Sequence, residues 1–343
     1  MSCEIRENLS EIQQQINFSG SILVQLENDI LLKQGYGYAN RSEELENNEA
    51  TRFGIASGCK LFTAIAVSQL EQNGQLSFDD RLIDCLDVDF PHFDNDITVH
   101  HLLSHTSGIP DYFDEEVMDD FEELWVKYPM YNLRELREFL PLFQHGRMMS
   151  RPGEKFHYNN AGYILLGMIV EHVSKLRFTD YVQKHIFNKA GMRRSGYFSF
   201  DSLPANTALG YIDNPDGTWR TNIYSLPVKG GSDGGAFVTV QDMANLWHVL
   251  LNGELLDKKH TDLLMETHCM VKGNSYYGYG VWIRKEGLEK YHVMGYDPGV
   301  SFHSAYYPEI SATVVVCSNK SDGAFDMMQA IEEALEAQWD RGY

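Results

Sequence analysis

Residues 51–74 read TRFGIASGCKLFTAIAVSQLEQNG, and this stretch combines a helix with a possible nucleophile. Apolar side chains from Phe62 to Gln72 recur at helical spacing, and Asn73-Gly74 supplies a helix stop. If the helix begins near Ser57, Lys60 lies three positions on and shares its face. A neutral Lys60 amine can take the Ser57 hydroxyl proton, and a helix N-terminus offers free backbone N–H groups. The spacing also arises by chance about once in such a chain, so a capping serine beside a surface lysine is the alternative.

A second segment, RPGEKFHYNNAGY at residues 151–163, carries Tyr158 and Asn160. A tyrosine that shares protons and an asparagine that offers its amide to a lysine or a substrate would complement a Ser–Lys pair. The same Tyr-x-Asn spacing occurs at Tyr38-Ala39-Asn40, at the end of a predicted strand, where we interpret it as hairpin structure.

The order of predicted elements indicates a sheet that is built from both ends of the chain. Strands are predicted at residues 21–26, 30–40, 236–240, 279–283, 291–294, 301–306 and 311–316. Helices are predicted at residues 4–16, 62–72, 163–173 and 324–339, and the acidic run 113–124 is interpreted as a solvated helix face. We therefore expect an α/β (α+β) fold, with an antiparallel sheet flanked by terminal helices and an inserted, mostly helical domain. The expected division is residues 1–58 plus 206–343 for the sheet domain and 59–205 for the insert.

Composition narrows the classes of partner. The 343 residues include 28 basic and 49 acidic side chains, for a formal net charge of −21. This balance argues against nucleic acid and an anionic membrane surface, which both attract basic proteins. No apolar stretch approaches a membrane span, and the polar N-terminus lacks a signal-peptide core. The five widely spaced cysteines suggest reduced thiols, so we expect a cytoplasmic protein.

Four segments in order resemble the serine beta-lactamase superfamily. They are residues 51–80, residues 101–111 (HLLSHTSGIPD), residues 152–167 (PGEKFHYNNAGYILLG) and residues 230–242 (GGSDGGAFVTVQD). The resemblance runs from about Ser21 to Asn319. It is closest to the class C-like branch, which includes class C beta-lactamases, DD-carboxypeptidase-like penicillin-binding proteins, D-aminopeptidases and esterases.

The resemblance implies acyl transfer through a serine ester. Ser57 would attack a carbonyl, Lys60 and Tyr158 would handle its proton, and Asn160 would orient Lys60 or the substrate amide. Backbone N–H groups, including that of Ser57, would stabilise the oxyanion. An ordinary lysine with a pKa of about 10.4 is rarely neutral at pH 7. Either the pKa of Lys60 is strongly depressed, or Tyr158, as a phenolate, shares the role of the base. No metal or organic cofactor is implied.

One motif departs from the family pattern. The third motif, Lys-Thr-Gly or His-x-Gly on a strand, is absent, and the corresponding stretch is YHVMGYDPGV at residues 291–300. Aligning Gly295 with the motif glycine places Val293 where the cation should be, whereas aligning His292 with the cation requires one extra residue. We take His292, Gly295 and Tyr296 as candidate substrate-orienting residues, with a structural strand histidine as the alternative for His292.

The missing cation favours a small ester or amide substrate without the carboxylate that this group normally meets. The expected function is therefore an esterase-like or peptidase-like serine hydrolase. The alternatives are a penicillin-binding or sensor-type relative that acylates but turns over little, and a weak beta-lactamase. The pocket rim is expected at residues 113–124 and around Tyr296, and the sequence does not indicate the oligomeric state.

Two other patterns in the sequence are typical of different chemistry, and their context argues against each. Residues 230–234 (GGSDG) match Gly-x-Ser-x-Gly, but a nucleophile elbow needs a helix directly afterwards, and a strand-like segment follows. His101 and His105 have the spacing of helical metal ligands, yet no glutamate follows the first histidine.

Overall fold

A computed structural model describes residues 2–118 and 120–339 of the chain. The main sheet of these residues has eight strands in the order β2-β1-β14-β13-β12-β11-β10-β9, and every neighbouring pair is antiparallel. The strands are β1 (Gly20–Leu26), β2 (Asp29–Tyr36), β9 (Cys269–Lys272), β10 (Ser275–Tyr277), β11 (Trp282–Arg284), β12 (Lys290–Asp297), β13 (Val300–Tyr307) and β14 (Ala312–Ser318). The predicted α/β architecture, with a sheet built from both chain ends, is confirmed.

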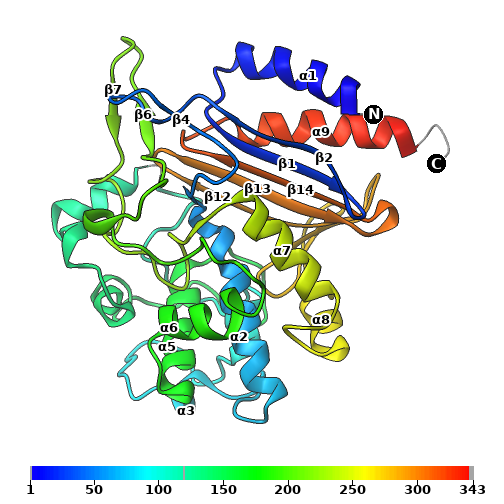
Figure 1. Cartoon of the computed structure of the whole chain (residues 1–343). Helices are drawn as coiled ribbons and strands as arrows, with labels where there is room; N and C mark the ends of the chain where they lie inside the picture. The colour runs from blue at the N-terminus through cyan, green and yellow to red at the C-terminus, as the bar shows by residue number, and fades with distance from the viewer. Residues whose placement is uncertain (1, 119, 340–343) are drawn as a thin grey trace.

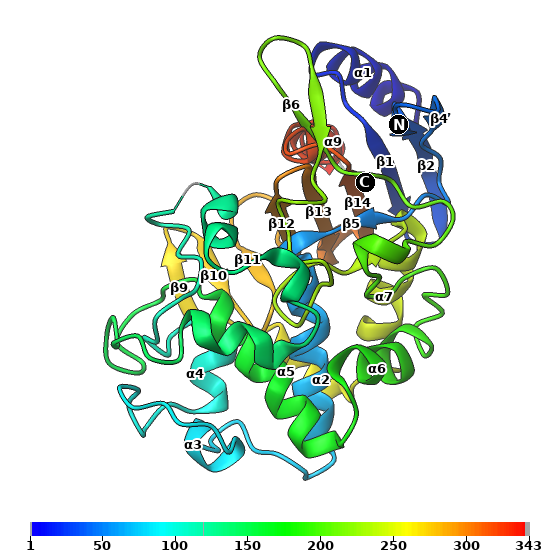
Figure 2. The ribbon, with the colours of Figure 1, turned by 90° about the vertical axis from the view of Figure 1, so that its left-hand side faces the viewer.

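Helices cover both faces of this sheet (Figure 1). The terminal helices α1 (Ser2–Gln15) and α9 (Ala324–Trp339) lie side by side on one face. On the other face α7 (Val240–Leu251) packs against β1 and β14, and the larger, mostly helical part also contains α2 (Lys60–Gln72), α5 (Asn160–Ser174) and α8 (Lys258–Leu264) (Figures 1 and 2).

The central strand β14 shows why the sheet is buried on both faces. Its residues 312–318 read ATVVVCS, a continuous apolar run rather than an alternating one, and all seven are buried. Because successive side chains of a strand point to opposite faces, Val314 and Val316 pack with α9, whereas Val315 and Cys317 join the core around α2. One continuous core thus links the inner sheet face to the helices, and the domain boundaries at residues 58 and 206 stay a prediction.

Shorter elements connect these layers. The small strands are β3 (Tyr38–Asn40), β4 (Leu45–Glu46), β5 (Phe53–Gly54), β6 (Tyr211–Asp213), β7 (Trp219–Thr221) and β8 (Phe237–Val238). The short α-helices are α3 (Leu82–Cys85), α4 (Val99–Leu103) and α6 (Phe178–Val182). The 3-10 segments are η1 (Ala56–Cys59), η2 (Phe121–Val126), η3 (Met130–Asn132), η4 (Leu136–Leu142), η6 (Phe200–Ser202) and η7 (Pro308–Ile310), and η5 (Gln183–Phe187) is a short π-helix. Pairing of β5 with β8 brings the segment before Ser57 next to the glycine-rich loop 230–235.

The acidic run 113–124 does not form the predicted helix. Residues 113–118 form a loop, and a 3-10 helical segment begins only at Phe121. The Asp114 and Asp120 side chains accept the N–H groups of Glu116 and Glu122, which is a local alternative to helical bonding. The Phe113 and Phe121 rings pack at 4.5 Å and fold the segment back on itself. Among the described residues, no helix combines the length and apolar character that a membrane crossing requires.

Candidate active site

Ser57 lies in the tight turn η1, between the short strand β5 and the long helix α2. The residue before it, Ala56, has a φ of +45°, a left-handed backbone conformation that costs energy for a residue with a Cβ atom. Lys60 is the first residue of α2, and its Nζ lies 2.9 Å from Ser57 Oγ. The spacing of the sequence motif therefore does bring the amine to the hydroxyl.

The Lys60 amine is buried and fully hydrogen-bonded. Besides Ser57 Oγ, its Nζ contacts Asn160 Oδ1 at 2.8 Å and the backbone oxygen of Asp233 at 2.7 Å. Three acceptors match the three donors of an ammonium group. Burial lowers the pKa of Lys60, but the negative charges that Tyr158 and Asp233 can carry raise it by more, so the pKa lies above its ordinary value. Lys60 is therefore a cation in the resting site.

Tyr158 is the third member of this centre. Its ring lies 4.9 Å from Lys60 Nζ, and its hydroxyl interacts with Ser57 and Lys60. The ring is held between His105, at 4.4 Å, and Trp282, at 5.9 Å. Burial raises the pKa of the Tyr158 hydroxyl to about 12, although the Lys60 charge acts in the opposite direction.

Asn160 begins helix α5, and the Asp111 carboxylate fixes its backbone. Asp111 accepts the N–H of Asn160 at 2.6 Å and that of Ala161 at 2.9 Å. The Asn160 amide donates to the Phe113 carbonyl at 3.2 Å, so its oxygen is left to face Lys60. Burial raises the pKa of Asp111 to about 7, against the opposing effect of these backbone bonds.

His105 holds the segment that carries Tyr158 and Asn160 in place. Its backbone φ is +57°, and its Nδ1 accepts the N–H of Asn159 at 3.0 Å. Its Nε2 lies 3.1 Å from the Tyr277 hydroxyl, and burial holds the pKa of the ring well below its usual range. His101 uses its Nδ1 to accept the N–H of Thr98 at 3.1 Å. The two histidines therefore serve as local structural partners, which explains their spacing without a metal.

Strand β12 passes directly behind the nucleophile at Gly295. A Cβ atom on Gly295 would lie 2.1 Å from the oxygen of Ile55, 2.8 Å from Ser57 N and 2.9 Å from Gly58 N. Only a glycine permits this approach. Val293, which the alignment on Gly295 assigns to the cation position of the family, is buried in the hydrophobic core.

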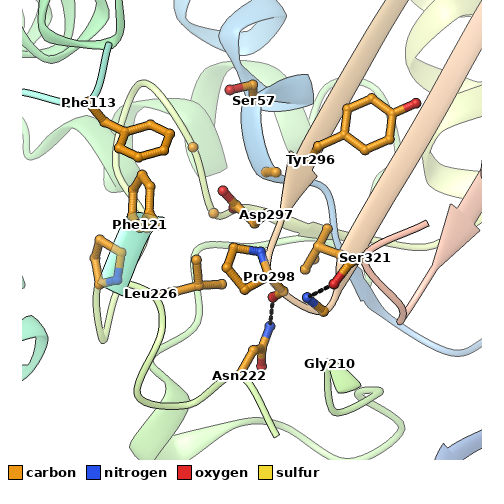
Figure 3. Close-up of a pocket in the computed structure, with 18 of the residues that line it drawn as sticks. Ser57, Phe113, Phe121, Gly210, Asn222, Leu226, Tyr296, Asp297, Pro298 and Ser321 are labelled. Carbon is orange, nitrogen blue, oxygen red and sulfur yellow. Dashed lines mark hydrogen bonds between the residues drawn. The ribbon is translucent and has the colours of Figure 1, made fainter. Parts of the chain in front are cut away.

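The other two candidates on β12 lie elsewhere. His292 does not line the cavity; it is on the sheet face toward α9, near Lys290 and His303. Its pKa is well below the usual range because of burial. Tyr296 lines the cavity edge, but its hydroxyl bonds to His303 Nε2 at 2.5 Å, and Figure 3 shows the ring turned away from Ser57.

Ser57 lines a cavity of about 670 Å³. Phe113 and Phe121 form one wall, and the β12–β13 turn at Pro298 forms the opposite side (Figure 3). The Asn222 amide donates to the Pro298 carbonyl at 2.9 Å and holds this turn in place. The rim expected around the acidic run and Tyr296 is therefore found at the cavity.

Sequence reasoning missed two carboxylates of the cavity, those of Asp233 and Asp297. The Tyr112 hydroxyl donates to Asp233, whose carboxyl has a raised pKa because of burial. Burial and the charge of Asp233 raise the pKa of Asp297 to about 8. The period-two alternation of a strand could have indicated Asp297, because it is two residues beyond Gly295 and shares its face.

The Gly-x-Ser-x-Gly pattern is part of this site without being a nucleophile elbow. Ser232 is fully buried behind α2, where Thr63 Oγ1 donates to its carbonyl at 2.5 Å. The loop instead supplies the Asp233 carbonyl to Lys60.

A sheet between terminal helices and a helical part, with a Ser-x-x-Lys turn at their junction, is the fold of beta-lactamases and transpeptidases. A family model described as Beta-lactamase matches residues 5–338. The chain therefore belongs to the beta-lactamase family, a family of serine hydrolases, as the sequence resemblance predicted.

Individual relatives agree with this assignment. The chain is 28% identical to penicillin-binding protein 4* of Bacillus subtilis, over 96% of this chain and 73% of that protein. A crystal structure of a penicillin-binding protein from Bacillus halodurans has 57% identity and a TM-score of 0.92, with 95% of this chain and 99% of that chain covered. A D-amino acid amidase from Ochrobactrum anthropi shares the fold with a TM-score of 0.81, at 20% identity over 98% of this chain and 99% of that chain.

Proposed function

We propose that the protein hydrolyses small esters or amides through an acyl ester on Ser57. The observation that carries this proposal is the 2.9 Å contact between Ser57 Oγ and Lys60 Nζ at the wall of a cavity, with the Tyr158 hydroxyl beside both. A hydroxyl that shares its proton with two such groups is the usual form of an activated serine nucleophile.

The first step of the reaction requires a group that accepts the Ser57 hydroxyl proton. As Ser57 Oγ bonds to the carbonyl carbon, its proton passes to the Lys60–Tyr158 pair. The tetrahedral intermediate then expels the alcohol or amine, which takes that proton, and a water molecule repeats both steps on the acyl ester. Because Lys60 is a cation that donates three hydrogen bonds, we assign the accepting role to the pair in its singly deprotonated form rather than to Lys60 alone.

The oxyanion requires backbone donors. The first N–H groups of a helical turn have no acceptor within the helix, which leaves the Ser57 N–H for the substrate. A two-residue turn joins β12 to β13, so Asp297 and Val300 form a hydrogen-bonded backbone pair. The N–H groups of neighbouring residues alternate between the two edges of a strand, so the Tyr296 N–H points away from β13, to the edge of β12 that faces β11. Pairing of β12 with β11 ends at His292, so that edge is open beside η1, and we propose Tyr296 N–H as the second donor.

The substrate class follows from the cavity. Of the lining residues that the structure describes, only Arg220 is basic, and it pairs with Glu122 at 2.7 Å. A carboxylate on the substrate would therefore lack a free cation other than Lys60. This supports an ester or amide without that carboxylate, and the amidase with the same fold is consistent with such a substrate.

A second candidate is a penicillin-binding relative that acylates but turns over little. The observation that favours it is the name of the relatives that share 57% and 28% identity with this chain, both penicillin-binding proteins.

Hydrolysis of p-nitrophenyl acetate and butyrate, together with labelling by a fluorescent penicillin, tests both candidates. Turnover of the esters that disappears in Ser57→Ala supports the hydrolase. Stable penicillin labelling without ester turnover supports the second candidate. Turnover that survives Ser57→Ala contradicts the assignment of the nucleophile.

A further inference from the structure

The face of β12 that passes behind the nucleophile carries an apolar residue before Gly295 and an acid after it. Val293, Gly295 and Asp297 alternate along β12 on the face toward η1. Val293 is buried in the core, and Asp297 lines the cavity. In Figure 3 the Asp297 side chain points toward Ser57. Among the described residues, none gives this partly buried carboxylate a hydrogen bond or an ion pair.

The surroundings of Asp297 are also acidic. Glu115 and Asp233 line the same cavity and face Asp297, while Lys60 is the nearby cation. The Lys60 ammonium already donates to three oxygens, and Arg220 is paired with Glu122. The cavity thus holds carboxylates without matching cations, an arrangement that a positively charged ligand would stabilise.

We infer that Asp297 selects substrates with a positively charged nitrogen close to the scissile carbonyl, such as an α-amino amide or ester. This inference rests on the proposed hydrolase function of Ser57. The ammonium would bind Asp297, with Glu115 as a second acceptor, while the carbonyl meets Ser57. The apolar wall of Phe113 and Phe121 would receive the substrate side chain (Figure 3). The nitrogen keeps its proton throughout, and acyl transfer proceeds as described above.

The test uses two anilides that differ in one amino group. Alanine p-nitroanilide, in each enantiomer, carries the ammonium, and propanoic acid p-nitroanilide lacks it. We expect kcat/KM to be about 10- to 100-fold higher for one alanine anilide, which is the effect of one charge-assisted hydrogen bond. Asp297→Asn should reduce this preference at least about tenfold. Equal kcat/KM values for the amino and des-amino anilides in the wild-type chain overturn the inference, as does a preference that Asp297→Asn leaves intact.

Two controls separate the possible failures. Asp87→Asn removes the same charge at an exposed position after α3, and it should keep the full preference. If Asp297→Asn does not fold, inhibition of wild-type p-nitrophenyl butyrate hydrolysis by n-propylammonium is compared with inhibition by n-propanol. Stronger inhibition by the cation, weakened by salt, supports the inference, and equal inhibition overturns it. Hydrolysis of the neutral ester that depends on Ser57, without any ammonium preference, leaves the proposed function standing while this inference fails.

Discussion

The backbones of Gly295 and Ser57 are in such close contact that a Cβ atom on Gly295 would lie 2.8 Å from the Ser57 nitrogen. This contact places strand β12 against the turn that holds the nucleophile, and it sets the spacing between the two proposed oxyanion donors. Gly295→Ala should therefore displace the strand or the turn. We expect a loss of at least about 100-fold in kcat for ester hydrolysis, the usual effect of one lost oxyanion donor.

Gly54→Ala is the matched control for this substitution. Gly54 lies in the short strand β5 just before the turn that holds Ser57, and the nearest atom to a Cβ there is Val300 Cγ2 at 3.4 Å, in a side chain that can shift. Circular dichroism and kcat should distinguish the two variants. If Gly295→Ala and Gly54→Ala lose the same activity, the close approach at Gly295 is not the cause.

Lys60→Met should abolish acylation more completely than Tyr158→Phe. The Lys60 substitution removes the group that bonds to Ser57 Oγ and leaves the Asn160 and Asp233 oxygens without a donor. Tyr158→Phe keeps that lysine and its three acceptors. We expect losses in kcat/KM of about 1,000-fold or more for Lys60→Met and about 100-fold for Tyr158→Phe, within the range of general acid–base effects.

Mass spectrometry after a single turnover shows whether the acyl group forms on Ser57 in each variant. A Tyr158→Phe protein that acylates at the wild-type rate would remove Tyr158 from the proton path.

Asp111→Asn tests how Asn160 is positioned. The carboxylate accepts the Asn160 and Ala161 N–H groups at the start of α5. An amide retains one acceptor oxygen, so one of these bonds is lost and the start of the helix shifts. We expect a lower melting temperature, since such a cap contributes about 1 kcal/mol, together with a reduced kcat. Asp84→Asn, at an exposed carboxylate in α3, is the control. An unchanged kcat for Asp111→Asn would show that Asn160 keeps its place without this contact.

Much of the fold was predictable because its signals are local. The apolar run of β14 and the spacing of α2 follow from periodicity, and the C-terminal helix Ala324–Trp339 has the predicted bounds. The acidic run was wrongly predicted as a helix because its short carboxylates take local N–H groups, and two aromatic rings fold it over the cavity.

The site was predictable only where both residues of a contact lie in the same short motif. Ser57 and Lys60 meet because one turn carries both. The contact of Lys60 with the Asp233 carbonyl joins segments that are 173 residues apart, and no periodicity indicates it. Asp297 was not predictable from the family motif, because the motif's cation precedes the glycine, whereas the cavity is lined by the residues after Gly295.

The pH dependence of an ammonium substrate should have two limbs. The pKa of Asp297 is raised to about 8 by burial and by the charges of Asp233 and Glu115, with Lys60 acting in the opposite direction. Ionised Asp297 binds a cation better, so kcat/KM for the preferred alanine anilide should rise as the pH passes through about 8. It should fall again where the substrate amine loses its proton. The trimethylammonium analogue cannot lose a proton, so its profile should keep the first limb and lack the second. A falling limb for that analogue would have to arise in the enzyme.

Asp297 should also cost stability at high pH. Its folded-state pKa of about 8 lies above the value of about 3.9 for an unfolded aspartate. Between these values the folded protein holds a proton that the unfolded chain has released, so the free energy of unfolding falls as the pH rises. The slope reaches up to about 1.4 kcal/mol per pH unit and ends above about pH 8. Asp297→Asn has no such proton to lose, so its stability relative to the wild type should increase from pH 4 to pH 8 and then level off. Urea midpoints at pH 5, 6.5 and 8.5 measure this difference, with Asp87→Asn beside them. A difference that stays flat or shrinks with rising pH would mean that the folded protein ionises Asp297 as easily as the unfolded chain does.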